Sequence, residues 1–126
     1  MAGATILRFD DTPWNDPAKP SGAPADMVRK AQAAGARSKR MVEGQGGFYV
    51  NRSDLPAGHT IQPHSHSHDE VLYVLRGGCT LNDGTSVGTG DAVVIHADNA
   101  YGFTCGPQGM EFLAIRTGDA RFQARD

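Results

Sequence analysis

The chain has 126 residues, with 12 Lys and Arg against 14 Asp and Glu, and a formal net charge of -2 at pH 7. This length suits one domain. A nucleic-acid-binding surface needs a basic excess and a membrane helix needs roughly 20 apolar residues in a row, and the sequence offers neither. The two cysteines form no CxxC pair, and the first residues lack the apolar core of a signal peptide, so we expect a cytoplasmic protein.

The N-terminal third divides into an arm and a helix. Residues 10–25 contain four of the seven prolines, which excludes a helix or a central strand and predicts an extended arm. Residues 26–41 are rich in Ala, Gln, Lys and Arg, which predicts one short helix with Asp26 as its N-cap. Gly35 disfavours a helix by about 1 kcal/mol relative to Ala and offers an earlier end for it.

From Gly44 onward, short apolar runs are separated by turns that contain glycine. The pair Asp83-Gly84 is typical of a type I′ hairpin turn. Eight short strands at this spacing predict an all-β sandwich or barrel rather than alternating strands and helices. The predicted strands are Phe48–Arg52, His59–Pro63, Glu70–Arg76, Cys79–Asn82, Thr85–Val87, Ala92–Ile95, Tyr101–Cys105 and Met110–Thr117.

Three of the five histidines lie within five residues, just before Glu70. Residues two apart in a strand share a face, so His64 and His66 project together and can both reach one ion at about 2.1 Å. A turn after His66 would bring the Glu70 carboxylate opposite them. Two imidazoles and one carboxylate suit iron with open coordination positions, and also zinc, manganese, nickel or copper. The alternative is an exposed histidine-rich loop that binds stray metal.

The spacing G-x5-H-x-H-x3-E-x6-G is filled by Gly58, His64, His66, Glu70 and Gly77. It resembles the complete first motif of the cupin superfamily, and the resemblance extends over residues 44–117. It implies a double-stranded β-helix (jelly-roll) barrel with one divalent transition metal ion in its mouth, and a homodimer. We therefore divide the chain into an N-terminal arm and short helix, residues 1–41, and a cupin barrel, residues 42–126.

The second cupin motif, G-x5-P-x-G-x2-H-x3-N, is altered in this chain. It begins at Gly90, but His96 stands at the proline position and Tyr101 at the histidine that supplies a fourth ligand in typical cupins. We expect a three-ligand site with Tyr101 just outside it as a hydrogen-bond donor or general acid. The alternatives are Tyr101 as a phenolate ligand, His96 as a ligand, or loss of the metal.

Strand alternation adds four candidate substrate-binding residues. Gln62 shares the face of the two histidines, and Leu72 shares that of Glu70. Phe103 shares the face of Tyr101. Arg116 would be an anchor for a substrate carboxylate if its strand face points inward, which alternation alone leaves open.

These features predict a metal-dependent enzyme that acts on a small organic molecule, with Glu70 and Tyr101 as catalytic groups. A three-ligand site leaves room for both oxygen and substrate, so a non-haem dioxygenase is the first choice. Lyase, isomerase or cyclase chemistry is the alternative, as is a cupin that binds a small ligand without turnover, because a fold does not select a reaction. No nucleic-acid or membrane partner is expected.

Overall fold

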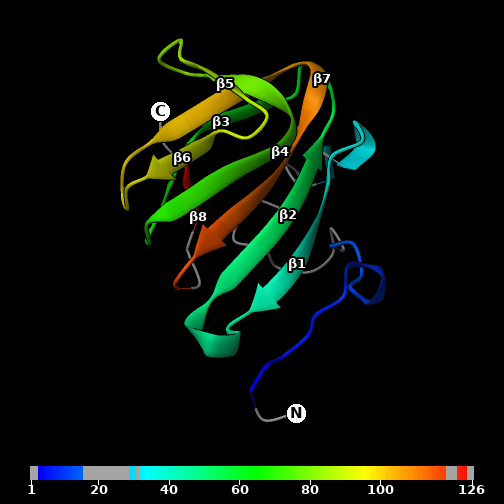
Figure 1. Cartoon of the computed structure of the whole chain (residues 1–126). Coiled ribbons are helices and arrows are strands. Elements are labelled where there is room, and N and C mark those ends of the chain that lie inside the picture. The colour runs from blue at the N-terminus through cyan, green and yellow to red at the C-terminus, as the bar shows by residue number, and fades with distance from the viewer. Residues whose placement is uncertain (1–2, 16–28, 31, 119–121, 125–126) are drawn as a thin grey trace.

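The computed structural model describes residues 3–15, 29–30, 32–118 and 122–124, and it is built almost entirely of antiparallel strands (Figure 1). The elements are two 3-10 turns, η1 (Phe9–Asp11) and η2 (Gln45–Gly47), and the strands β1 (Arg37–Glu43), β2 (Tyr49–Leu55), β3 (Thr60–His66), β4 (Glu70–Leu81), β5 (Ser86–Gly88), β6 (Ala92–Ile95), β7 (Tyr101–Arg116) and β8 (Phe122–Ala124). The predicted all-β jelly roll is confirmed. Within the described ranges, no helix has the length and hydropathy needed to cross a bilayer.

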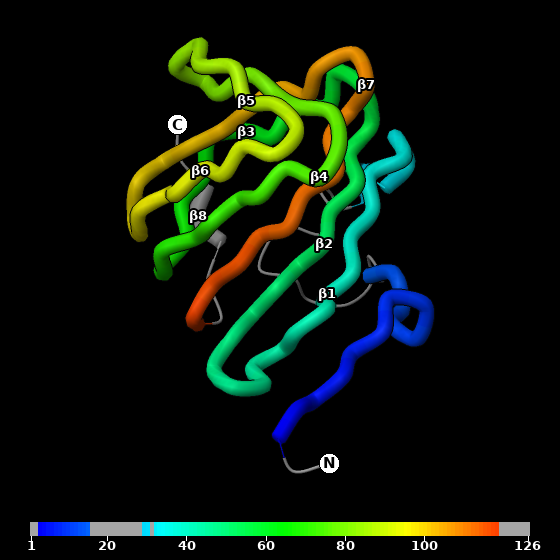
Figure 2. The backbone as a smooth tube through the Cα atoms, in the orientation of Figure 1, coloured from blue at the N-terminus to red at the C-terminus, as the bar shows by residue number. Residues whose placement is uncertain are grey.

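The long strands β4 and β7 organise the fold. β7 pairs with β4 along one side, and on its other side it pairs first with β3 and then with β2. Register shifts in the β4–β7 ladder, after Val74 and after Gly77, bend both strands, and Figure 2 shows β7 turning back near the top of the view. The two halves of β7 therefore face each other, and Phe103 packs edge-on against Phe112 with ring centroids 6.1 Å apart.

The core lies between these halves and consists of inward-facing residues at alternate positions. Leu72 and Val74 of β4 and Met110, Phe112 and Ala114 of β7 are all buried, Met110 being only 1% exposed. The residues between them on the outer face, Tyr73 in β4 and Glu111 and Leu113 in β7, are partly or fully exposed, as the period of two in a strand requires. This alternation gives the last strand one clearly internal face.

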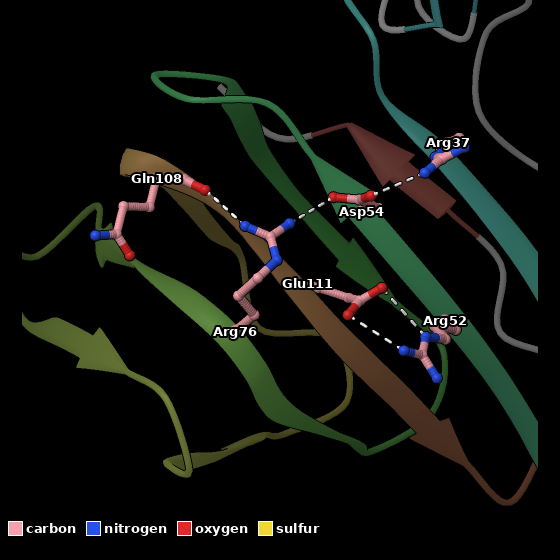
Figure 3. A network of polar contacts seen from close by, with 6 residues as sticks. All are labelled: Arg37, Arg52, Asp54, Arg76, Gln108 and Glu111. Carbon is pink, nitrogen blue, oxygen red and sulfur yellow. Dashed lines mark hydrogen bonds and ion pairs between the residues drawn. The ribbon is translucent and has the colours of Figure 1, made fainter.

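Ion pairs link β1, β2, β4 and β7 on the outer face of the sheet (Figure 3). Asp54 forms ion pairs with Arg76 at 2.9 Å and with Arg37 at 3.4 Å. Glu111 forms an ion pair with Arg52 at 3.2 Å. Exposed pairs of this kind contribute about 0–1 kcal/mol each. The buried apolar residues therefore stabilise the sheet more than these ion pairs do.

The helix predicted over residues 26–41 does not reach residue 41, and the earlier end that the sequence offered at Gly35 is the one observed. Residues 29–30 and 32–33 are helical, and Gly35, with φ of 102°, occupies the left-handed conformation that commonly ends a helix. Residues 37–43 form β1, which pairs with β2 and buries Lys39. Pairing with a neighbouring strand therefore outweighs the helix preference of this segment. The sheet thus begins inside the range predicted as arm and helix; residues 16–28, which hold most of the predicted arm, lie outside the described residues.

The other predicted strands are confirmed with altered ends. The two runs predicted at 70–76 and 79–82 form the single strand β4, and those at 101–105 and 110–117 form β7. Their intervening glycines lie in bends of a continuous strand rather than in turns between strands. Asp83-Gly84 does form a hairpin turn, but only Gly84 has a positive φ, so the turn is not type I′. β8 was not predicted.

Candidate functional site

Strand ends bring the predicted site residues together. His64 and His66 lie at the end of β3, Glu70 begins β4, and Tyr101 and Arg116 are the first and last residues of β7. The bend in β7 carries both of its ends to one carboxylate. The Tyr101 hydroxyl donates a hydrogen bond to Glu70 Oε1 at 3.4 Å, and Arg116 Nη1 lies 3.7 Å from Glu70 Oε2. The predicted metal ligands and the predicted general acid are therefore neighbours.

The backbone fixes the tautomer of His64. Its Nδ1 lies 2.9 Å from the Gln62 carbonyl oxygen, which can only accept, so Nδ1 carries the proton. Burial lowers the pKa of His64, although the bond to Gln62 opposes this, and the ring is therefore neutral at pH 7 with a lone pair on Nε2. This Nε2 lies 3.1 Å from Nε2 of His66, which must be the donor between the two rings.

Burial also shifts the two oxygen acids. Glu70 is 3% exposed, and this burial raises its pKa, while Arg116 and the Tyr101 hydroxyl partly offset the shift. Burial and the nearby Glu70 charge raise the pKa of Tyr101 well above its usual value. The Tyr101 hydroxyl therefore keeps its proton at neutral pH, which suits a hydrogen-bond donor or an acid better than a phenolate.

The two histidines fit a metal ion more closely than the complete triad does. Two nitrogens bound at right angles to one ion at about 2.1 Å lie about 3.0 Å apart, close to the observed 3.1 Å. A histidine that donates its other ring N–H to a carbonyl has the usual tautomer of a metal ligand.

The Glu70 carboxylate lies farther from the two histidines than a shared metal ion would place it. Glu70 Oε2 is 3.7 Å from His66 Nε2, and the same carboxylate contacts Arg116 and Tyr101. Among the residues that the structure describes, no three His, Cys, Asp or Glu side chains lie close enough together to hold a metal ion. A three-ligand site therefore requires the Glu70 side chain to turn from Arg116 towards the histidines.

The remaining candidates are placed as follows. Leu72 and Phe103 are buried in the core at 3% and 4% exposure. The Gln62 side chain is exposed, because a register shift between Ile61 and His64 interrupts the alternation on which its prediction rests. The Gln62 backbone carbonyl, which accepts the hydrogen bond from His64 Nδ1, could not be predicted from residue type, because every residue carries a backbone carbonyl. His96 is exposed in the loop after β6, whereas the Tyr101 ring centroid lies 4.6 Å from that of His64.

The inward direction of Arg116 is now decided. It continues the buried face of Phe112 and Ala114, and its side chain is only 11% exposed. Sequence alternation correctly grouped these three residues, but the side of the sheet on which they lie depends on how β7 packs.

The sequence matches the cupin domain family over residues 51–116, and the chain therefore belongs to the cupin family. A comparison with curated proteins finds no match. Among solved structures, KdgF from Halomonas sp. is similar with a TM-score of 0.65 and 17% identity, over 97% of this chain and 96% of that one. The polyketide cyclase RemF from Streptomyces resistomycificus has a TM-score of 0.70 and 20% identity, over 98% and 86% of the two chains.

A salicylate 1,2-dioxygenase from Pseudoaminobacter salicylatoxidans is similar over 72% of this chain but only 29% of its own length, with a TM-score of 0.61 and 15% identity. At these identities the similarities establish a shared fold. They also show that this fold serves proteins named for quite different reactions, so a reaction has to be argued from the site.

Proposed function

We propose that this protein is a metal-dependent cupin enzyme acting on a small organic molecule, with His64, His66 and Glu70 as ligands of one divalent transition metal ion. The observation that carries the proposal is the 3.1 Å approach of the two histidine Nε2 atoms, with His64 held in the tautomer of a ligand. Such an ion supplies a Lewis acid and open coordination positions. A three-residue ligand set leaves more coordination positions open than the four ligands of typical cupins do. Both oxygen and substrate could then bind the ion, and dioxygenase chemistry is therefore the first candidate.

The placement of Tyr101 favours a second candidate, a lyase, isomerase or cyclase. The buried hydroxyl keeps its proton and points it at Glu70 Oε1, 3.4 Å away. A substrate oxygen that reaches this hydroxyl could take the hydrogen bond in place of Glu70, so that Tyr101 acts as a general acid. Reactions of this kind shift protons without consuming oxygen, and RemF, similar in fold over most of both chains, is named a polyketide cyclase.

Metal content tests the proposal directly. Protein purified without chelators should contain close to one transition metal ion per chain by elemental analysis, and His64→Ala and His66→Ala should each lose it. The matched control is His96→Ala, because this histidine is exposed and lies after β6. Metal-free wild-type protein, or metal retained in both His64→Ala and His66→Ala, would contradict the proposal.

Oxygen consumption then separates the two candidates. Oxygen uptake with 1,3-diketones or catechol-like compounds supports a dioxygenase, and its absence across a broad panel favours the proton-transfer reactions. Tyr101→Phe removes one hydroxyl and leaves the ring in contact with His64. We expect this variant to keep its metal and lose turnover by roughly 10²–10⁴-fold, as for other general acids. Loss of the metal instead would make Tyr101 a ligand.

A further inference from the structure

The Arg116 guanidinium is buried without adequate hydrogen-bond partners. Its side chain is 11% exposed, and its buried Nε forms no hydrogen bond with any residue that the structure describes. A guanidinium carries five N–H donors and stays charged at every pH a protein tolerates. A charged donor that is buried and unsatisfied costs free energy, so such a group calls for a partner.

Glu70 does not satisfy this guanidinium. The distance of 3.7 Å from Arg116 Nη1 to Glu70 Oε2 exceeds hydrogen-bond range, so the contact is an ion pair without a hydrogen bond. The same carboxylate also faces His66 at 3.7 Å and accepts from Tyr101 at 3.4 Å. Two parallel N–H bonds from an arginine are satisfied best by a planar carboxylate that is held by nothing else.

The charges of the site point to the same ligand. The opposite single charges of Arg116 and Glu70 face each other at 3.7 Å and cancel. Holding a divalent cation there would leave a net charge of about +2 in a largely buried cluster, which is costly without an anion. This step rests on the proposed function; the unsatisfied guanidinium does not.

We propose that Arg116 is the specificity-determining residue of this site and that the ligand is a small organic carboxylate, bound through its carboxylate group to the Arg116 guanidinium. Because Arg116 adjoins Glu70, and Glu70 adjoins His66 and Tyr101, the rest of such a ligand lies beside the histidine pair and the Tyr101 hydroxyl. Arg116 ends a strand whose preceding inward residues are buried, so the backbone position from which its side chain projects is fixed before the ligand arrives.

Two pairs of isosteres test this, benzoate against benzamide and propionate against propionamide, titrated calorimetrically into metal-loaded and metal-free protein. A bound cation attracts carboxylates by itself, so the readout is the change caused by substitution. We expect Arg116→Gln to lose at least about tenfold in carboxylate affinity with little change for the amides. Arg116→Lys keeps the charge without the planar fork and should lie between. The control is Arg76→Gln, which removes the same charge from the outer face and should bind like wild type.

The outcomes separate this inference from the proposed function. Protein that holds no metal, but loses carboxylate affinity through Arg116→Gln, keeps the inference and refutes the metal-dependent enzyme. Protein that holds metal, but binds carboxylates equally with and without the guanidinium in both Arg116 variants, refutes the inference alone. Binding of inorganic phosphate more tightly than either carboxylate would also overturn it. Thermal melts of both variants check that they fold.

Discussion

Substituting two glycines of the first motif by alanine separates two contributions to the free energy of unfolding, the strain of a left-handed backbone conformation and the strain of a close contact. Gly58 and Gly77 have nearly equal positive φ values of 71° and 73°. A methyl group added at Gly58 would meet nothing within 4 Å. At Gly77 it would overlap the carbonyl oxygen of Gly109, with the carbonyl carbon at 2.9 Å, where β4 pairs with β7 beside their bend.

The magnitudes follow from these two situations. A left-handed conformation costs an L-residue about 1–2 kcal/mol, and the stiffer unfolded chain of Ala returns about 0.4–1 kcal/mol. Gly58→Ala should therefore reduce the free energy of unfolding by about 1 kcal/mol. Gly77→Ala pays the same cost and must also separate two backbones, which adds about 1–3 kcal/mol or more. We expect a total loss of about 2–4 kcal/mol, a large share of the roughly 5–15 kcal/mol typical of a domain.

Urea denaturation of the two variants and wild type measures both losses, provided that the slopes with urea agree. For a chain of this length, 1 kcal/mol corresponds to roughly 4 °C in Tm. Gly58→Ala should therefore melt about 4 °C below wild type and Gly77→Ala about 8–16 °C below it. Equal losses would refute the reasoning, because they would mean that the approach of β4 to β7 adds nothing to the strain at φ.

Four further predictions concern the rest of the fold. Lys39 is buried and donates a hydrogen bond to the Phe9 carbonyl at 2.7 Å, and its ammonium lies 3.5 Å from the centroid of the Phe9 ring. Lys39→Met should therefore reduce the free energy of unfolding by about 1–3 kcal/mol and speed proteolysis at residues 3–15. An unchanged cleavage rate would contradict this. Burial raises the pKa of the Cys105 thiol from 9.0 to about 11, so iodoacetamide at pH 8 should modify it about 100-fold more slowly in native than in denatured protein. Because the folded state then holds the thiol proton more tightly, this group's contribution to stability should be lost as the pH rises from about 9 to about 11, which denaturation at each pH measures and Cys105→Ala should abolish. Phe112→Ala should cost about 3–5 kcal/mol in the urea assay, since it opens a cavity beside Phe103, and a loss below 1 kcal/mol would place the core elsewhere.

Much of the site could be predicted from local spacing. Residues two apart on a strand share a face whatever the rest of the chain does, so His64 and His66 were paired correctly, and the short turn to Glu70 made its return opposite them the simplest connection. The same rule failed for Gln62, because a bulge interrupts the alternation. The homodimer and the cytoplasmic location stay predictions.

Features that depend on pairing between strands far apart in the sequence could not be predicted from local spacing. Local composition favours a helix at residues 37–41, and only the partner strand β2 makes this segment a strand. Alternation grouped Phe112, Ala114 and Arg116 but could not say which side of the sheet is internal, because that follows from how β7 packs against Leu72 and Val74. Tyr101 and Arg116 both contact the Glu70 carboxylate because a 16-residue strand bends until both of its ends reach Glu70, and that bend is set by long-range register. Sequence spacing thus determined the histidine pair, and tertiary structure decided the charges and donors that surround it.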